Sequence, residues 1–150
     1  MIMKEINLKI QILNNAVGKP EYGSLQASGL DLKAGIKKNI NIKSRDFTII
    51  PTGIIIEIPQ GFEAQVRPRS GLAANNGVSV LNSPGTIDSD YRGEIKVILI
   101  NLGQVDFLIT PGMRIAQLVI SPTYKANISF VEEILSNTKR GKDGFGSTGL

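Results

Sequence analysis

Two aspartates that stand two residues apart, Asp88 and Asp90, could supply a general base. They lie in a wide hairpin within residues 78–101, where an apolar stretch ends at Ile87. An ionised carboxylate can take a proton from water, and partial burial beside Ile87 would favour Asp88 for that role. Aspartate in a turn more often bonds to nearby backbone groups, so this structural interpretation stays open. Tyr91 beside them is either a packing residue or the flat wall of a sugar pocket.

The segment RPRSGLA, residues 67–73, could bind an anion. Pro68 keeps the preceding residue extended, and Ser70 can then open and cap a short helix. Free N–H groups at that turn, the Ser70 hydroxyl and the Arg69 guanidinium could converge on one phosphate. Gly71 would let the backbone approach the anion closely. The alternative is a capped helix with a surface arginine.

Three further polar residues interrupt apolar strand patterns. Arg114 and Gln117 stand in the apolar segment 111–120, where such residues often simply face solvent. Asp31 lies between two leucines in ASGLDLKA, residues 27–34, and is expected on the face opposite to them. A buried carboxylate requires a partner, and the local sequence names none.

The segment from residue 137 onward, NTKRGKDGFGSTGL, is rich in glycine and has no periodic apolar face. One interpretation is a disordered basic tail, because chain ends are often loose. The other is an arm that becomes ordered on a ligand. Phe145 favours the arm, because an aromatic ring between Gly144 and Gly146 has no neighbours to pack with and would need a flat partner to stack on.

Strands must position these groups, because apolar residues recur at every second position, as in Leu8, Ile10 and Ile12. The abundance of Ile and Val, with Gly, Pro, Asn and Asp clusters between the segments, predicts an all-β sandwich or barrel. One short helix is expected between Ser70 and Gly77. The expected strands are 6–12, 29–34, 46–50, 53–59, 63–67, 78–82, 94–101, 105–109, 114–121 and 128–132.

The composition of the 150 residues limits the chemistry. The chain has no His and no Cys, which excludes disulfides, thiolate nucleophiles, Cys/His zinc sites and every catalytic pair that contains either residue. An oxygen-liganded ion such as Mg²⁺ is the metal that fits what remains. The net charge of +4 favours anionic partners, but the few scattered aromatics argue against nucleic acid.

Neither the N-terminal residues nor the longest apolar run suggests export or a membrane span. MIMKEINLKI has charges inside its apolar stretch and no small-residue cleavage site. FTIIPTGIIIEIP is broken by Pro51, Gly53 and Glu57. We therefore expect a cytoplasmic protein with no membrane partner.

Taken in order, five segments resemble the five motifs of the trimeric dUTP diphosphatase (dUTPase) family. Each motif is weak alone, but five in the right order over residues 27–149 make a specific resemblance. The fifth departs slightly, because Lys142 and Asp143 occupy positions that the family leaves variable. In motif order the segments are ASGLDLKA, RPRSGLA, NSPGTIDSDYRGEI, RIAQLVI and RGKDGFGSTG.

The resemblance implies an all-β, jelly-roll-like subunit that forms a homotrimer with active sites at the subunit interfaces. Residues 1–136 would form the β-domain, and residues 137–150 a flexible C-terminal arm that closes over a neighbouring subunit's site. The reaction would be hydrolysis of dUTP to dUMP and diphosphate, which keeps uracil out of DNA and supplies dUMP for dTMP synthesis. Asp88 would activate water for attack on the α-phosphorus, with Mg²⁺ on the phosphates and Asp31 holding the metal indirectly, through water.

The same resemblance implies the substrate contacts. The phosphates would be bound by Arg69, Ser70, Gly71 and Gln117, and by Arg140 and Ser147 of the arm. Gly146 of the arm would also bind the substrate. Uracil would be recognised by the Asn82 side chain and by the main chain of Thr86, Ile87 and Lys96. Tyr91 would pack under the deoxyribose and exclude a 2′-hydroxyl, and Phe145 would cover the base.

Two other functions stay open. The dCTP deaminases, including the form that also releases diphosphate, share the fold, but those chains tend to be longer and carry a glutamate in a differently built site. A nucleotide-sensing or protein-interaction module would reuse the scaffold without turnover. The intact third motif argues against the first, and the presence of both Asp88 and the arm argues against the second.

Overall fold

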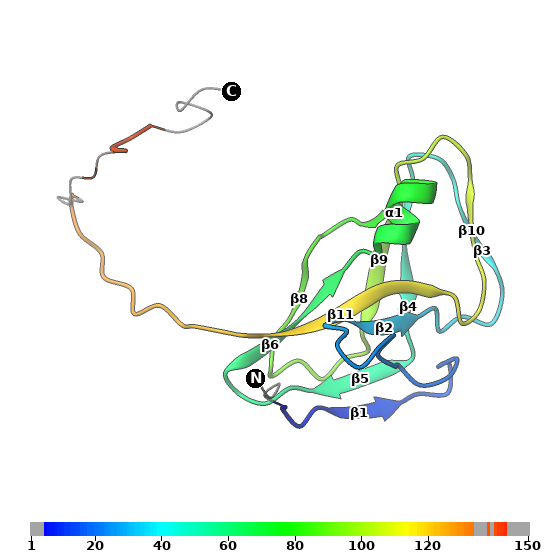
Figure 1. The fold of residues 1–150 in the computed structure, drawn as a ribbon, viewed down its shortest axis with the longest axis horizontal. Helices are drawn as coiled ribbons and strands as arrows, with labels where there is room; N and C mark the ends of the chain where they lie inside the picture. The colour runs from blue at the N-terminus through cyan, green and yellow to red at the C-terminus, as the bar shows by residue number, and fades with distance from the viewer. Residues whose placement is uncertain (1–4, 134–137, 139, 144–150) are drawn as a thin grey trace.

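The computed structural model describes residues 5–133, 138 and 140–143. These residues form eleven strands and one short helix (Figure 1). In chain order the elements are β1 Lys9–Ile12, β2 Leu30–Lys33, β3 Ile40–Ile42, β4 Phe47–Pro51, β5 Ile54–Glu57, β6 Phe62–Arg67, α1 Ser70–Asn76, β7 Val78–Val80, β8 Gly85–Ile87, β9 Lys96–Asn101, β10 Phe107–Ile109 and β11 Arg114–Pro122.

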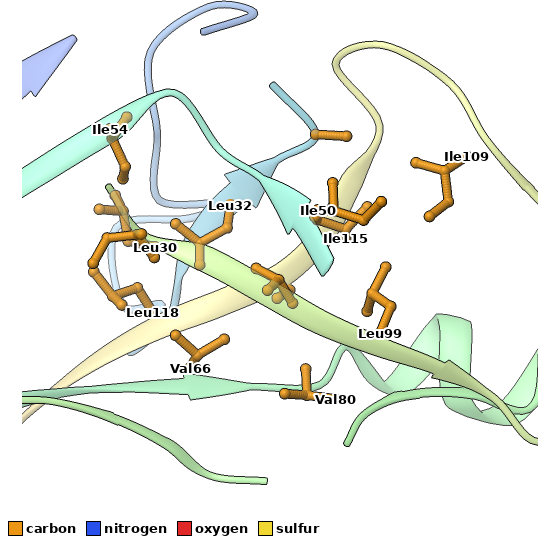
Figure 2. Packing of buried hydrophobic residues seen from close by; sticks show 14 of the residues in the cluster. Leu30, Leu32, Ile50, Ile54, Val66, Val80, Leu99, Ile109, Ile115 and Leu118 are labelled. Atoms are coloured by element: carbon orange, nitrogen blue, oxygen red, sulfur yellow. The ribbon is translucent and has the colours of Figure 1, made fainter. Parts of the chain in front are cut away.

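Two antiparallel sheets carry most of the architecture. The larger has the order β2-β11-β6-β8 and the smaller the order β4-β9-β7, while β1 pairs with β5 and β3 pairs with β10. Figure 2 shows Leu118 and Val66 of the larger sheet packed in the same core as Leu99 and Val80 of the smaller one. The prediction of an all-β fold is confirmed.

The two-residue repeat explains why these segments form strands. In β9, Val97 and Leu99 are fully buried, whereas Ile98 and Ile100 alternate with them on the other face. In β2, Leu30 and Leu32 are buried and Asp31 lies on the opposite face, as predicted. Each buried aliphatic side chain contributes about 1.5–3 kcal/mol relative to an exposed one. The aliphatic core therefore fixes which polar residues face outward.

Three strand predictions need correction. Residues 128–132 form no strand, because no neighbouring segment within the described residues pairs with them. Strand β3 was not predicted, and neither was β8. β8 lies inside the predicted hairpin loop and pairs with β6 in the larger sheet, whereas β7 and β9 on either side of it belong to the smaller sheet. Both missed strands are only three residues long, so their pattern is too short to show a period.

The chain after β11 leaves the body of the molecule as an extended segment, coloured orange in Figure 1. Its apolar residues are unusually exposed: Tyr124 and Phe130 are each 96% exposed, and Ile128 is 71% exposed. Within the part of the chain that the structure describes, no helix is long and apolar enough to cross a membrane.

Candidate active site

The turn from β6 into α1 builds one group of candidate residues. β6 ends at Arg67, and Arg69 is the helix N-cap with an extended backbone, so Ser70 is the first helical residue. No side chain caps this helix, so the expectation that Ser70 caps it is wrong. Gly77 ends the helix in the left-handed conformation (φ 66°), as predicted. The Ser70 hydroxyl is therefore not used as the helix cap.

Asp31 is paired with two arginines, Arg69 and Arg114, that are distant from it in the sequence. Its Oδ1 lies 3.3 Å from Arg69 Nε, and its Oδ2 lies 3.1 Å from Arg114 Nη1. Arg69 Nη1 also donates to the Arg114 carbonyl oxygen at 3.0 Å. Only 14% of the Asp31 side chain is exposed, so these bonds hold the Arg69 guanidinium in place. Two arginines against one carboxylate leave this cluster with a net positive charge, which suits an anionic ligand.

Gln117 joins the same cluster through the sheet register. It lies opposite Asp31 on β2 and opposite Arg67 on β6, and its Nε2 donates to the Pro68 carbonyl oxygen at 2.9 Å. Gly29 leaves the room for this amide, because a Cβ there would overlap the Gln117 side chain. Three segments far apart in the sequence thus meet at one end of β6.

Arg114 was noted as an interruption of its strand but was not assigned to the predicted site. The structure brings it to Asp31 and Arg69. The signal that could have found it is its spacing on β11, three residues before Gln117, but a β-bulge between Arg114 and Ala116 changes which face each residue occupies.

The hairpin residues form a second group. β8 lies beside β6, with Ile87 opposite Ala64, and a turn follows in which the Tyr91 N–H donates to the Asp88 carbonyl oxygen at 3.1 Å. Ile87 packs against the core, but Asp88 itself is exposed, so the expected partial burial is not found in the single chain. Within residues 5–133, the Asp88 carboxylate has no hydrogen-bond or ion-pair partner.

Asp88 faces an open groove of about 870 Å³, which it lines with Glu63, Asp90, Arg92 and Glu57 among others. The hydrogen bond and the charge of Lys9, whose Nζ lies 2.8 Å from Glu57 Oε1, lower the pKa of the Glu57 carboxyl. Glu57 is therefore the weaker base and is already paired. Asp88 and Asp90 are the carboxylates of this groove that have no hydrogen-bond or ion-pair partner within residues 5–133, and Asp88 directly follows β8.

Asn82, Thr86 and Lys96 lie along the same hairpin. The Asn82 amide packs beside Gly85, at the end of β8 nearest Arg67, and Thr86 is paired with Gln65 of β6. Lys96 begins β9 opposite Pro51. All three are exposed, so their polar groups are available to a ligand.

The Asp88 end of the hairpin and the cationic cluster lie at opposite ends of β6 in one chain. Gln117 is aligned with Arg67, whereas Ile87 is aligned with Ala64 and Asp88 shares its groove with Glu63. Four residues of strand separate these two positions, which is roughly 13 Å. A general base acts within hydrogen-bond reach or through one water molecule, so a strand offset of this size is too long for direct contact between the two groups. In a single chain the hairpin carboxylate and the cationic cluster therefore lie apart.

The described residues of the C-terminal segment, 138 and 140–143, make no contact with either group that would add to it. Arg140 is exposed and donates from Nε to the Asp143 carbonyl oxygen at 2.9 Å, in a turn that lies away from the body (Figure 1). Phe145, Gly146 and Ser147 lie outside the described residues.

A family model described as dUTPase matches residues 16–149. The chain belongs to the dUTPase family. Its relatives within that family include proteins named deoxyuridine 5'-triphosphate nucleotidohydrolase from Rickettsia bellii and Rickettsia prowazekii. The first is 58% identical over 145 residues, 95% of each chain, and the second is 54% identical over 149 residues, 99% of this chain and all of the other.

Solved dUTPase structures share the fold of this family member. A mutant of the Staphylococcus bacteriophage 80alpha dUTPase with dUpNHpp matches with a TM-score of 0.86 at 24% identity, covering 96% of this chain and 99% of the other. A mutant dUTPase from phage phi11 of S. aureus, solved to describe the coordination of a structural Mg(II) ion, matches with a TM-score of 0.76 at 22% identity, covering 85% of this chain and 98% of the other.

Proposed function

We propose that the chain hydrolyses dUTP to dUMP and diphosphate. The observation that carries this proposal is the identity of 54–58%, over nearly the whole chain, to proteins named deoxyuridine 5'-triphosphate nucleotidohydrolase. The test is diphosphate release from dUTP in the presence of Mg²⁺. Ammonia release from dCTP would favour a deaminase instead, and tight dUTP binding with no hydrolysis would favour a nucleotide sensor.

Asp88 is the proposed general base. It would orient a water molecule and take its proton as the water attacks the α-phosphorus in line, while diphosphate leaves. Its exposure and its lack of a side-chain partner in the described chain support this role, because the carboxylate oxygens are free to accept a bond from water. Such a base typically contributes about 10²–10⁴-fold to the rate.

The cationic cluster at the other end of β6 is the proposed phosphate site. Arg69, Ser70 and the Gly71 N–H, with the Gln117 amide, would stabilise the charge that builds up on the phosphate oxygens. The ion pair of Arg69 with Asp31 and the hydrogen bond that Arg69 donates to the Arg114 carbonyl oxygen support this role, because they fix the guanidinium before substrate arrives. Little reorganisation is then needed at the moment of reaction.

The hairpin is the proposed base and sugar site. The Asn82 amide and the main chain of Thr86, Ile87 and Lys96 would match the hydrogen-bonding edge of uracil. Cytosine exchanges donor and acceptor, so it would leave buried groups unpaired at about 1–3 kcal/mol each. The methyl group of thymine would collide with the pocket, and a ribose 2′-hydroxyl would collide with Tyr91.

A resident metal site built from protein ligands does not fit the described residues, because no three His, Cys, Asp or Glu side chains there are placed so that they could hold one ion. Mg²⁺ held mainly by substrate phosphates and water does fit, since this ion keeps much of its hydration shell. Asp31 would then contact it through water, although both of its carboxylate oxygens already face arginines. When bound, the ion would neutralise phosphate charge.

We further propose a homotrimer whose sites are shared between subunits. The separation of Asp88 from the phosphate cluster supports this, because a neighbouring copy can supply the missing half of each site. The outer face of the β4-β9-β7 sheet also supports it. There Phe47 is opposite Ile100 and Ile49 is opposite Ile98, and the first strand's residues are 55% and 54% exposed. Apolar side chains in a continuous patch on both strands are typical of a subunit interface.

Ile49→Asp is expected to prevent trimer assembly and to abolish turnover, because it places a charge in the proposed apolar contact. Sedimentation should give the monomer mass with the strand signal retained in circular dichroism. Leu25→Asp is the matched control, since Leu25 is 97% exposed and lies outside this face. An active, trimeric Ile49→Asp variant would rule the interface out.

We also propose that residues 1–136 form the β-domain and that residues 137–150 form a C-terminal arm. The arm would bring Arg140, Gly146 and Ser147 to the phosphates and Phe145 over the base of a neighbouring site. We also propose a cytoplasmic location, because dUTP is formed and consumed inside the cell.

A further inference from the structure

The ring of Tyr91 lies directly over Gly93. A Cβ built at Gly93 would overlap the Tyr91 hydroxyl and the edge of its ring, with Cε2 only 2.9 Å away. Gly93 is not among the glycines with positive φ, so its backbone does not itself require glycine. Instead, glycine is required here because the Tyr91 ring occupies the space that a side chain at position 93 would fill.

A hydrogen bond holds the far end of the same ring. The Tyr91 hydroxyl donates to the Glu94 carbonyl oxygen at 3.2 Å. Glu94 is anchored in turn, because its Oε1 accepts from Asn15 Nδ2 at 2.8 Å and from the Gly53 N–H at 2.9 Å. The ring therefore rests on a glycine and is tied to a carbonyl that does not move freely.

The turn before it fixes the backbone of Tyr91. Arg92 Nη1 donates to the Ser89 carbonyl oxygen at 2.7 Å and to the Tyr91 carbonyl oxygen at 2.8 Å. With the Tyr91 N–H bonded to Asp88, both ends of the residue are held. Tyr91 is nevertheless 44% exposed, so the residue remains accessible to a ligand.

We infer that Gly93 is a positioning residue that sets the discrimination between deoxyribose and ribose. This inference rests on the proposed function, in which Tyr91 packs under the sugar. A pocket that excludes a hydroxyl group by shape alone gives weak selectivity, about 10²-fold. That selectivity therefore depends on a side chain that is held rigidly in place. Gly93 and the Glu94 carbonyl oxygen hold the Tyr91 ring in its position beside the proposed sugar site.

A methyl group at Gly93 should move the ring without unfolding the chain. The overlap is with the far end of a side chain, which can rotate away, and not with backbone. The displaced ring would no longer bond to Glu94 and would open space beside the 2′ position. The expected change is one of specificity.

The test compares kcat/KM for dUTP and for UTP in the trimeric enzyme with Mg²⁺. In Gly93→Ala the dUTP:UTP ratio should fall at least about tenfold, through a lower KM for UTP and a higher KM for dUTP, with kcat for dUTP changing less. Tyr91→Phe keeps the ring and loses the hydroxyl bond, so its ratio should fall by about threefold. Gly23→Ala is the control, because a Cβ at Gly23 meets nothing within 4 Å.

The possible results distinguish a failure of the proposed function from a failure of the role inferred for Gly93. A wild-type enzyme that does not hydrolyse dUTP overturns the proposed function and this inference with it. An active wild type with an unchanged ratio in both Gly93→Ala and Tyr91→Phe overturns this inference alone. If Gly93→Ala does not fold, the Tyr91→Phe ratio decides, because the loss of one hydroxyl leaves the ring volume intact.

Discussion

Asp88→Asn is expected to lower kcat for dUTP by about 10²–10⁴-fold while dUpNHpp still binds. The amide keeps the size of the carboxylate but cannot take a proton from water. Asp88 is exposed and makes no side-chain bond within residues 5–133, so the substitution leaves no buried group unpaired and should not affect folding. Single-turnover hydrolysis and calorimetric titration with dUpNHpp measure the two quantities separately.

Asp90→Asn is the matched control for this experiment. It removes one negative charge from the same turn and the same groove, so it reproduces any general electrostatic effect on a polyanionic substrate. We expect it to turn over dUTP close to the wild-type rate. Equal losses in both variants, or a wild-type kcat in Asp88→Asn, would show that the base is another group.

Much of the fold could be predicted from the sequence, because burial of one strand face imposes a strict two-residue repeat. Segments such as β9, with Val97 and Leu99 inward, show that repeat plainly. The repeat does not reveal a strand that has only a few residues or that pairs with a strand distant in the sequence. β8 is three residues long and pairs with β6, about twenty residues earlier, so no local pattern announces it. Residues 128–132 carry the pattern of a strand but pair with no other segment among the described residues.

The residue types of the site were predictable, but their grouping was not. Asp31, Arg69 and Arg114 meet only because β2, β6 and β11 are neighbours in one sheet, and that order is a property of the topology. The same topology puts Asp88 at the other end of β6. Local sequence gives no information about the separation of Asp88 from the arginine cluster. This separation is the strongest argument within one chain for the proposal that the site is shared between copies.

Removing residues 138–150 is expected to leave a folded trimer with kcat/KM for dUTP reduced by about 10²-fold or more. Each charge-assisted hydrogen bond to phosphate is worth about 1.5–3 kcal/mol, and the truncation removes the proposed contacts of Arg140 and Ser147 together. The bonds of the described residues 138 and 140–143 are all made within that segment, so the core loses no contact of theirs. Lys142→Ala, in the same segment but outside the proposed contacts, should keep the parent rate.

Mixed trimers would show on which subunit the arm acts. Truncated chains lack the arm but retain Asp88, and full-length Asp88→Asn chains have the arm but lack the base. If the arm closes over a neighbour's site, trimers refolded from both chains together contain some sites with a working base and a working arm, and activity returns well above the sum of the two separate samples. If each arm serves the Asp88 of its own chain, no mixed site is complete and the sum is not exceeded. Parent-level turnover by the truncated chain alone would instead exclude any role for the arm.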